Sequence, residues 1–203
     1  MFDSRAPLRF AGRFLLIFVL LTLPWPGFRE SYCRLIRSEA HWLLTTTLKN
    51  VIVIIEDNDD PQHPSVDTRI TLGNRRDIRA DGTGPVRVIV IDSRSLGWMP
   101  NAMFIALMGA LASRTWFWLR GFFTGLLLVN VFIAATLWIT VAHGYFEASA
   151  AARLQICLGY ANRLLVTNLW VSFVFPTLIW LGCLRMVWEG GMLRGWFSGS
   201  PSR

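Results

Sequence analysis

Four long apolar stretches alternate with polar segments along the chain, at residues 14–28, 96–112, 116–142 and 169–187. Each stretch approaches or reaches the roughly 20 mostly apolar residues with which a helix crosses a bilayer. Charged residues interrupt these stretches only near their ends. The pattern therefore predicts a mainly α, polytopic membrane protein with about four transmembrane helices.

The first stretch follows a basic start, so a cleaved signal peptide and a retained anchor are both open interpretations. No small-x-small cleavage site follows the run, which ends in Pro24, Trp25 and Pro26. This ending favours a retained anchor. The two prolines are expected to end or kink the helix where it reaches the membrane interface.

Residues 29–95 form the main polar segment. A helical period over Tyr32–Thr47 predicts a helix that lies on the membrane surface or packs against the rest of the protein. Three runs rich in β-branched residues follow, at Val51–Glu56, Val66–Leu72 and Val86–Asp92, and turn-forming residues separate them. We expect a small extracytoplasmic α+β insertion with a three-stranded antiparallel sheet. Such a sheet is marginal alone, so it is a candidate docking surface.

Residues 148–168 combine apolar positions at helical spacing, including Leu154, Cys157 and Leu158, with polar residues that disfavour spanning. We expect an amphipathic helix outside the bilayer core. If this helix spanned the membrane, the C-terminus would lie on the opposite side.

These elements predict five consecutive segments. A cytoplasmic tail (1–13) precedes a transmembrane helix (14–28) and the extracytoplasmic segment (29–95). A three-span membrane region (96–188), which contains the amphipathic helix at 148–168, precedes a cytoplasmic C-terminal tail (189–203).

Composition supports the membrane class. The chain is 53% hydrophobic and 16% charged, whereas a soluble domain carries roughly 25% charged residues. Aromatic residues are too numerous for a disordered chain, with 14 Phe and 10 Trp.

The distribution of charge predicts orientation. Formal net charge is +7, yet residues 29–95 carry equal numbers of acidic and basic residues. Arginine outnumbers acid in the N-terminal tail, in the loop between the second and third stretches, and at the C-terminus. Because lysine and arginine near span ends favour the cytoplasm, both termini are expected there. We expect a bacterial inner membrane protein with residues 29–95 periplasmic or extracellular. The dispersed basic residues do not indicate nucleic-acid binding.

Few residues suggest catalytic or metal chemistry. The histidines His41, His63 and His143 have no partner at metal-ligand spacing, so no metal site is expected. His143 is a candidate ligand for a pigment or haem, or alternatively an interfacial histidine, and no cofactor is predicted. Cys33 is either a free thiol or paired with Cys157, a choice that sequence alone leaves open.

Several residues in the apolar stretches are candidates for helix packing. Asn101 and Asn130 are costly in lipid, and an interhelical hydrogen bond between them is the favoured interpretation. Gly121 and Gly125 form a G-x-x-x-G pattern that permits close approach of helices. Tryptophan favours membrane interfaces, and the candidates for this role are Trp42, Trp98, Trp138 and Trp170.

Residues 92–142 contain Ser93, the pair Ser95-Leu96, a loop with Arg114 and Arg120, and then Asn130. This arrangement resembles the core of the exosortase and archaeosortase membrane proteins and of the small exosortase-associated membrane proteins. In exosortases, a motif of cysteine, serine or alanine, and glycine followed by Ser-Leu opens one span. A basic loop and a span with Asn-x-x-Arg follow.

The resemblance implies a relation to proposed membrane transpeptidases that act on C-terminal sorting signals through a cysteine and two basic residues. Here Asp92 or Ser93 occupies the position of the cysteine, and no arginine follows Asn130 at the expected spacing. A carboxylate cannot replace a thiol nucleophile with the same chemistry. The resemblance therefore implies an inactive relative or an accessory protein.

Three functions follow from these observations. We favour a non-catalytic accessory or assembly subunit that docks to other integral membrane proteins of a larger complex. The alternative is an exosortase-related processing enzyme, with Ser93, Arg94, Asp92 and His143 as the candidate catalytic residues. A second alternative is a pigment- or haem-associated subunit that uses His143.

Overall fold

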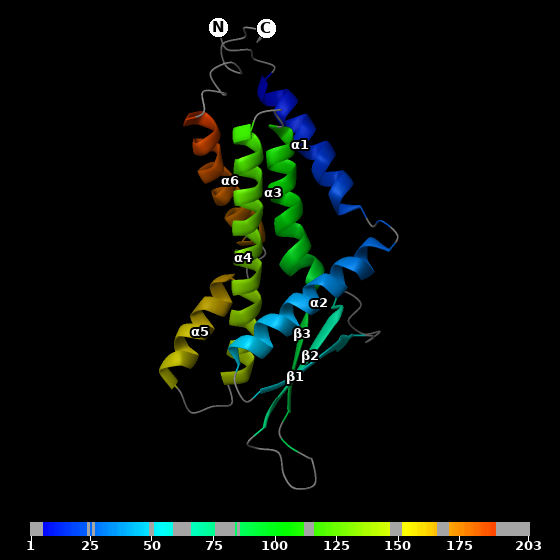
Figure 1. Ribbon diagram of the computed structural model, residues 1–203, viewed down its shortest axis with the longest axis vertical. Helices are drawn as coiled ribbons and strands as arrows, with labels where there is room; N and C mark the ends of the chain where they lie inside the picture. The colour runs from blue at the N-terminus through cyan, green and yellow to red at the C-terminus, as the bar shows by residue number, and fades with distance from the viewer. Residues whose placement is uncertain are drawn as a thin grey trace. The chain divides into compact units, whose positions relative to one another are not determined.

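The computed structural model describes residues 6–23, 25, 27–48, 51–58, 66–75, 84, 86–111, 116–146, 152–165 and 171–189. The helices are α1 (Ala6–Thr22), α2 (Phe28–Thr47), α3 (Met99–Ala110), α4 (Trp116–Phe146), α5 (Ala152–Leu165) and α6 (Val171–Glu189) (Figure 1). The strands are β1 (Val51–Asp57), β2 (Thr68–Asn74) and β3 (Val86–Ile91), and a π-helical turn, η1 (Arg94–Trp98), precedes α3. The predicted combination of a mainly helical chain with a three-stranded sheet is confirmed.

The chain divides into two compact units. The helical unit contains α1, α3, residues 116–131 of α4, and α6 from Ser172. The sheet unit contains α2, the three strands, η1, residues 132–146 of α4, and α5.

The sheet is antiparallel throughout, in the order β1-β2-β3. Side chains that lie directly opposite one another share a face of the sheet. Ile70 pairs with Ile55 on one side and Ile89 on the other, which places these three residues on the inner face. The β-branched runs therefore form strands as predicted, with β2 beginning at Thr68 and not at Val66.

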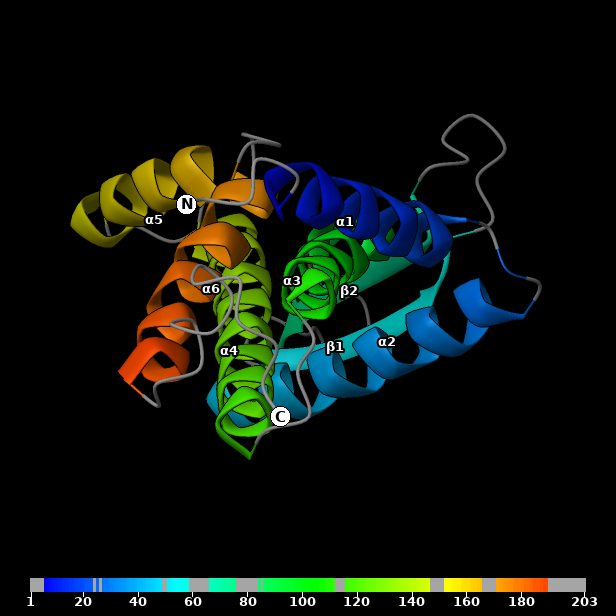
Figure 2. The same ribbon diagram turned by 90° about the horizontal axis from the view of Figure 1, so that it is seen from above.

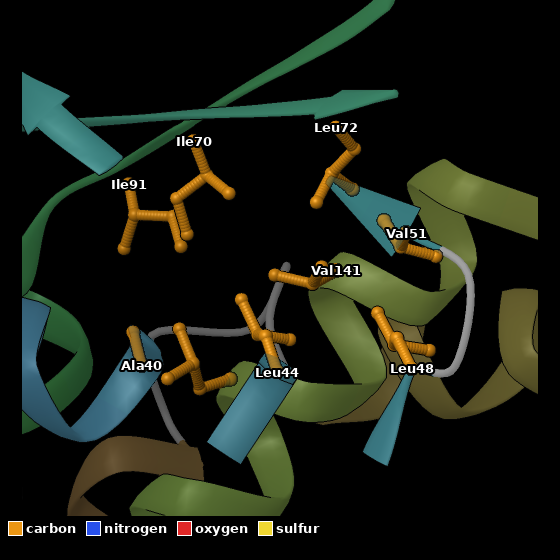
Figure 3. Packing of buried hydrophobic residues seen from close by; sticks show 9 residues of the cluster. Ala40, Leu44, Leu48, Val51, Ile70, Leu72, Ile91 and Val141 are labelled. Atoms are coloured by element: carbon orange, nitrogen blue, oxygen red, sulfur yellow. The ribbon is translucent and has the colours of Figure 1, made fainter. Parts of the chain in front are cut away.

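The inner face packs against α2 and the C-terminal half of α4 (Figure 3). The fully buried cluster comprises Ala40, Leu44, Leu48, Val51, Ile70, Leu72, Ile91, Leu137 and Val141. On α2 the buried positions recur with helical spacing, as the sequence pattern predicts. Ala40 is one of these buried positions, whereas the neighbouring His41 is exposed. Removal of this apolar surface from water is the main force holding the sheet unit together.

The helix α2 also packs closely on the turn η1. A β-carbon added at Gly97 would lie 2.5 Å from Tyr32 Oη and 2.9 Å from Ile36 Cδ1. Trp98 packs edge-to-face against Phe28 and Tyr32, with ring centroids 4.5 and 5.3 Å apart. A larger residue at position 97 would therefore require the Tyr32 and Ile36 side chains to move.

The start of the chain differs from the expected span at 14–28. Helix α1 covers Ala6–Thr22, so Arg9 and Arg13 lie inside it and not in a tail. Phe28 is the first residue of α2, and Gly27 before it has a φ of 73°, in the left-handed region that favours glycine. The chain therefore breaks inside the apolar run. Pro24 and Pro26 lie outside the described residues.

In the helical unit, α1 lies beside α3 (Figure 1 and Figure 2). Phe10 of α1 stacks against Trp180 of α6, with ring centroids 5.9 Å apart. Trp118 Nε1 donates a hydrogen bond to the carbonyl oxygen of Met108 at 3.1 Å and so joins α4 to α3. Aromatic and aliphatic contacts connect the helices of this unit.

Within the described residues, one helix is long and apolar enough to cross a membrane, at Trp116–Tyr145. The apolar helix at Ser172–Arg185 is shorter, and α1 has 17 residues. The prediction of four spans therefore stays a prediction.

Helix α5 falls within the expected range 148–168, and its described side chains follow the predicted apolar stripe in part. Leu158 is buried as expected, whereas Cys157 is exposed. Ile156 and Tyr160, which lie outside the predicted stripe, are exposed as well.

Candidate functional site

Four buried polar residues lie together at one end of the sheet unit's core, and we call them the polar cluster: Cys33, Asp67, Thr68 and Ser93. Cys33 belongs to α2, Asp67 and Thr68 lie at the start of β2, and Ser93 follows β3. Buried polar groups are costly unless they are hydrogen-bonded, so their partners define what the cluster does.

The carboxylate of Asp67 accepts three hydrogen bonds. Asp67 Oδ1 accepts from Thr68 Oγ1 at 3.0 Å and from the Ser93 backbone N–H at 3.1 Å. Asp67 Oδ2 accepts from Cys33 Sγ at 3.3 Å. The hydroxyls of Thr68 and Ser93 lie 3.1 Å apart and share a further hydrogen bond. One carboxylate therefore joins α2, β2 and the segment after β3.

An ion pair lies beside the cluster. Arg37, one turn after Cys33 on α2, pairs through Nη1 with Asp57 Oδ1 at the end of β1. Arg37 Nε also donates to the carbonyl oxygen of Cys33 at 3.1 Å. Because the Asp57 side chain is 65% exposed, this pair adds little stability.

Asp92 caps the helical turn that follows β3. Its Oδ1 accepts from the backbone N–H groups of Arg94 at 3.0 Å and Ser95 at 3.3 Å. The Leu96 N–H donates to the Asp92 carbonyl oxygen at 3.0 Å. This is the pattern of an N-cap aspartate, which satisfies amides that a helix start leaves without a partner.

The candidate catalytic residues do not form a nucleophile–base arrangement. Ser93 is 0% exposed and its hydroxyl is shared with Thr68. No hydrogen bond joins Ser93 or Asp92 to His143 in the part of the chain that the structure describes. A serine nucleophile needs an adjacent base and access to substrate. The arrangement of Asp92 and Ser93 is instead that of residues that fix the backbone.

His143 lies in the last turn of α4, beside α5. A β-carbon added at Gly159 of α5 would lie 3.7 Å from His143 Cε1. Its Nδ1 is buried and has no hydrogen-bond partner among the described residues. Those residues include no group of three or more histidine, cysteine or acidic side chains that could hold a metal ion. His143 could therefore supply a single ligand at most to a bound group.

The candidate packing residues lie in the helical unit. Asn101 and Asn130 form two reciprocal amide hydrogen bonds, each 3.4 Å long, between α3 and α4. Gly125 faces Phe104 and Cys183, and an added β-carbon would overlap the Phe104 ring and lie 2.9 Å from Cys183 Sγ. Gly121 is buried on the same side of α4.

The tryptophan candidates have different environments. Trp42 of α2 is exposed, and Trp138 Nε1 donates to Thr47 Oγ1 at 3.1 Å. Trp98 packs against Phe28 and Tyr32, as described above. Trp170 and the loop residue Arg114 lie outside the described residues.

Cys33, Cys157 and Cys183 form no disulfide with one another. The alternative of a disulfide between Cys33 and Cys157 is therefore wrong. The Cys33 thiol is buried and donates to Asp67, whereas Cys157 is exposed.

The outer face of the sheet is apolar and exposed. Its aliphatic side chains include Ile54 on β1 and Val86, Val88 and Val90 on β3, all of them exposed. The register places Ile54, Thr71 and Val88 in one row across the three strands. We call the surface formed by Ile52, Ile54, Thr71, Val86, Val88 and Val90 the outer sheet face. Exposed contiguous apolar surface is typical of an interaction site.

The sequence pattern did not identify Asp67 or Cys33 as members of one cluster. Strict alternation through residues 66–72 puts Asp67 on the same side as Arg69, but β2 begins after Asp67, and Asp67 is buried. Thr68 lies on the side of Ile70 and Leu72, in agreement with the alternation. The one signal in the sequence was this polar Thr68 at a position that faces the core.

Fold and site together define a class: a mainly helical protein with a strongly apolar helix and a small antiparallel sheet. Buried polar groups beside the sheet hydrogen-bond to one another. The family model of exosortase H-associated membrane proteins matches residues 4–186, and the chain belongs to that family. No curated protein and no solved structure matches significantly. The resemblance to exosortase-associated membrane proteins is thus confirmed, whereas the missing catalytic cysteine stays a prediction.

Proposed function

We propose that this protein is a non-catalytic accessory or assembly subunit that docks to a larger membrane complex containing an exosortase. The observation that carries the proposal is the family match over residues 4–186, because the family's name associates its members with exosortase H. The match includes every helix and strand of the sheet unit. Partner binding therefore involves a surface that belongs to the family's common core.

Geometry at the start of the second apolar stretch supports a non-catalytic role. The residues that align with the exosortase motif, Asp92 and Ser93, hold backbone amides and a buried hydroxyl network. Movement of the Ser93 side chain toward a substrate would remove one hydrogen bond from the buried Thr68 hydroxyl, at about 1–3 kcal/mol. Movement of the Asp92 side chain would leave the Arg94 and Ser95 amides without their cap, at about 1 kcal/mol. These residues stabilise the fold of a surface that a partner can use.

The arrangement in the membrane is part of the proposal. The four apolar stretches, which contain α1, η1 with α3, α4 and α6, cross the bacterial inner membrane, with both termini in the cytoplasm and residues 29–95 outside. Asn101, Asn130, Gly121 and Gly125 then serve helix packing. Trp42, Trp98, Trp138 and Trp170 lie near the membrane interfaces.

Co-expression with an exosortase from the same organism tests the proposal. The tagged chain is extracted in a mild detergent, purified, and weighed by native mass measurement. We expect a complex of fixed stoichiometry. A polytopic membrane protein of similar size with the same tag is the control for detergent carry-over. A stable monomer without exosortase would overturn the proposal.

A pigment- or haem-associated subunit is a second candidate function, and the observation that favours it is the buried, unpartnered Nδ1 of His143. An absorption spectrum of the purified complex tests it. Visible absorbance that His143→Gln abolishes, with the mass of the complex unchanged, would support this candidate. A colourless complex would argue against tight binding.

A further inference from the structure

Strand β3 is an edge of the sheet, with β2 on one side and no described strand on the other. Its inner face is covered at Ile89, which packs against α4. A β-carbon added at Gly144 of α4 would lie 2.6 Å from Ile89 Cδ1. Its outer side chains Val86, Val88 and Val90 are exposed. The strand thus presents an apolar face beside a row of backbone groups open to pairing.

Natural proteins protect such edges with lysine, proline, inward-pointing charges or bulges. Strand β3 has no lysine, proline or bulge between Val86 and Ile91, and its six residues pair with β2 without interruption. Its one charged residue, Arg87, lies opposite Leu72 in the register of the inner face. A lone charge disfavours indiscriminate pairing at such an edge, but a strand that brings a carboxylate to it can still pair with β3.

The occupant is a protein segment and not lipid. Backbone N–H and C=O groups of an open strand edge cannot be satisfied in the hydrocarbon of a bilayer. A partner strand satisfies them by continuing the sheet, as in recognition by β-strand addition.

Charge distinguishes a different protein from a second copy of this chain. Strands β2 and β3 carry two arginines, Arg69 and Arg87, and no acidic residue, and both arginines are exposed. Glu56 of β1 lies directly opposite Arg69, whereas Arg87 lies opposite Leu72 and has no facing carboxylate on the three strands. A second copy would bring further arginines to this edge, whereas a segment with a carboxylate complements it.

We propose that β3 binds an extended, apolar segment of the partner protein that carries a carboxylate near Arg87 and adds to the sheet as a fourth strand. This inference rests on the proposed function and assigns the docking surface of that same complex. The partner's apolar side chains cover Val86, Val88 and Val90. Its backbone pairs with the free edge of β3.

A matched pair of lysine variants tests the proposal in the full chain co-expressed with the exosortase. Val88 and Ile54 are both β-branched, lie in the same row, and are 45% and 47% exposed, but they belong to opposite edge strands. We expect Val88→Lys to lower exosortase recovery about tenfold, because an edge lysine blocks strand addition. Ile54→Lys should leave recovery within about twofold of wild type, since it changes the edge that the partner does not use.

A second variant and a crosslink test the same site independently, so that the proposal remains testable if Val88→Lys does not fold. Arg87→Glu alters an exposed position and should lower recovery about fivefold, the effect of losing roughly 1 kcal/mol. A photoreactive phenylalanine at position 88, but not at 54, should crosslink to an exosortase segment with an acidic residue. Thermal unfolding in detergent checks that each variant is folded.

Each outcome has one meaning. Equal losses for Val88→Lys and Ile54→Lys would indicate docking onto the sheet face and overturn strand addition. Unchanged recovery for Val88→Lys and Arg87→Glu would overturn the β3 site while leaving the proposed function intact. Failure of the wild-type chain to recover exosortase would overturn both.

Discussion

Asp67 is the residue on which most of the polar cluster depends. Its carboxylate is the acceptor for a hydroxyl, a thiol and a backbone amide that come from different parts of the sheet unit. Removal of a buried acceptor costs more than the bond itself is worth, because the donors lose their partners. The cluster therefore fixes the segment after β3 more strongly than any single contact suggests.

Replacement of Asp67 tests this role. Asp67→Ala should destabilise the protein by about 2–4 kcal/mol, since three donors lose one acceptor group. The midpoint of thermal unfolding in detergent measures the change. Asp92→Ala is the comparison, with about 1 kcal/mol expected for the loss of an N-cap. Equal effects of the two variants would contradict the central position of Asp67.

Ser93 distinguishes a structural hydroxyl from a nucleophile. Ser93→Ala removes the hydrogen bond to Thr68 and should cost about 1 kcal/mol, without change in the processing activity of a co-expressed exosortase. Processing of a reporter substrate in cells is the measurement, and Thr68→Val is the matched structural control. Loss of processing with Ser93→Ala but not with Thr68→Val would restore the catalytic alternative.

At the scale of the helix and strand, β-branched runs identify the three strands because extended backbone accommodates these side chains on both faces. The sequence pattern also locates the centre of each long helix. It fails at the first span, because the apolar run continues through Gly27, whereas helix α1 ends at Thr22 and a new helix begins at Phe28. It also places Cys157 of α5 on the buried face although the residue is exposed, since the spacing of apolar residues cannot show how far a neighbouring helix covers them.

The polar cluster shows a second limit of prediction from sequence. Cys33, Asp67 and Ser93 lie far apart in the chain, and only the folded sheet unit brings them together. The pair Asp92-Ser93 attracted a catalytic interpretation because the same residue types serve in caps and in active sites. Hydrogen-bond geometry distinguishes a cap from an active site, but this geometry exists only in the folded protein and cannot be predicted from the sequence.

Helix packing in the helical unit gives a prediction with an internal control. Gly125→Ala should destabilise the protein by about 1–3 kcal/mol, because the added carbon overlaps Phe104. Gly182→Ala on α6 meets nothing within 4 Å and should be neutral or stabilising by up to about 1 kcal/mol. Thermal unfolding midpoints in detergent compare the two. Similar destabilisation by both variants would show that Gly125 does not mark a close helix contact.

For the whole molecule, the proposed topology predicts which thiol meets the extracytoplasmic space. Cys157 is exposed, whereas Cys33 and Cys183 are buried. In intact spheroplasts, a membrane-impermeant maleimide should modify one thiol per chain, and Cys157→Ser should abolish the modification. Mass measurement of the purified protein counts the modified thiols, with denatured protein as the control for all three. Modification only after the membrane is opened would reverse the orientation.

The open edge of β3 also has a consequence for how the cell makes this protein. A chain synthesised in excess of its partner carries an open strand that pairs with other unfolded or orphan chains. Such molecules are removed by proteases or accumulate as aggregates. The steady-state abundance of this protein should therefore follow the abundance of its partner and not its own rate of synthesis. The exposed edge of one six-residue strand would in this way keep the two proteins in equal amounts.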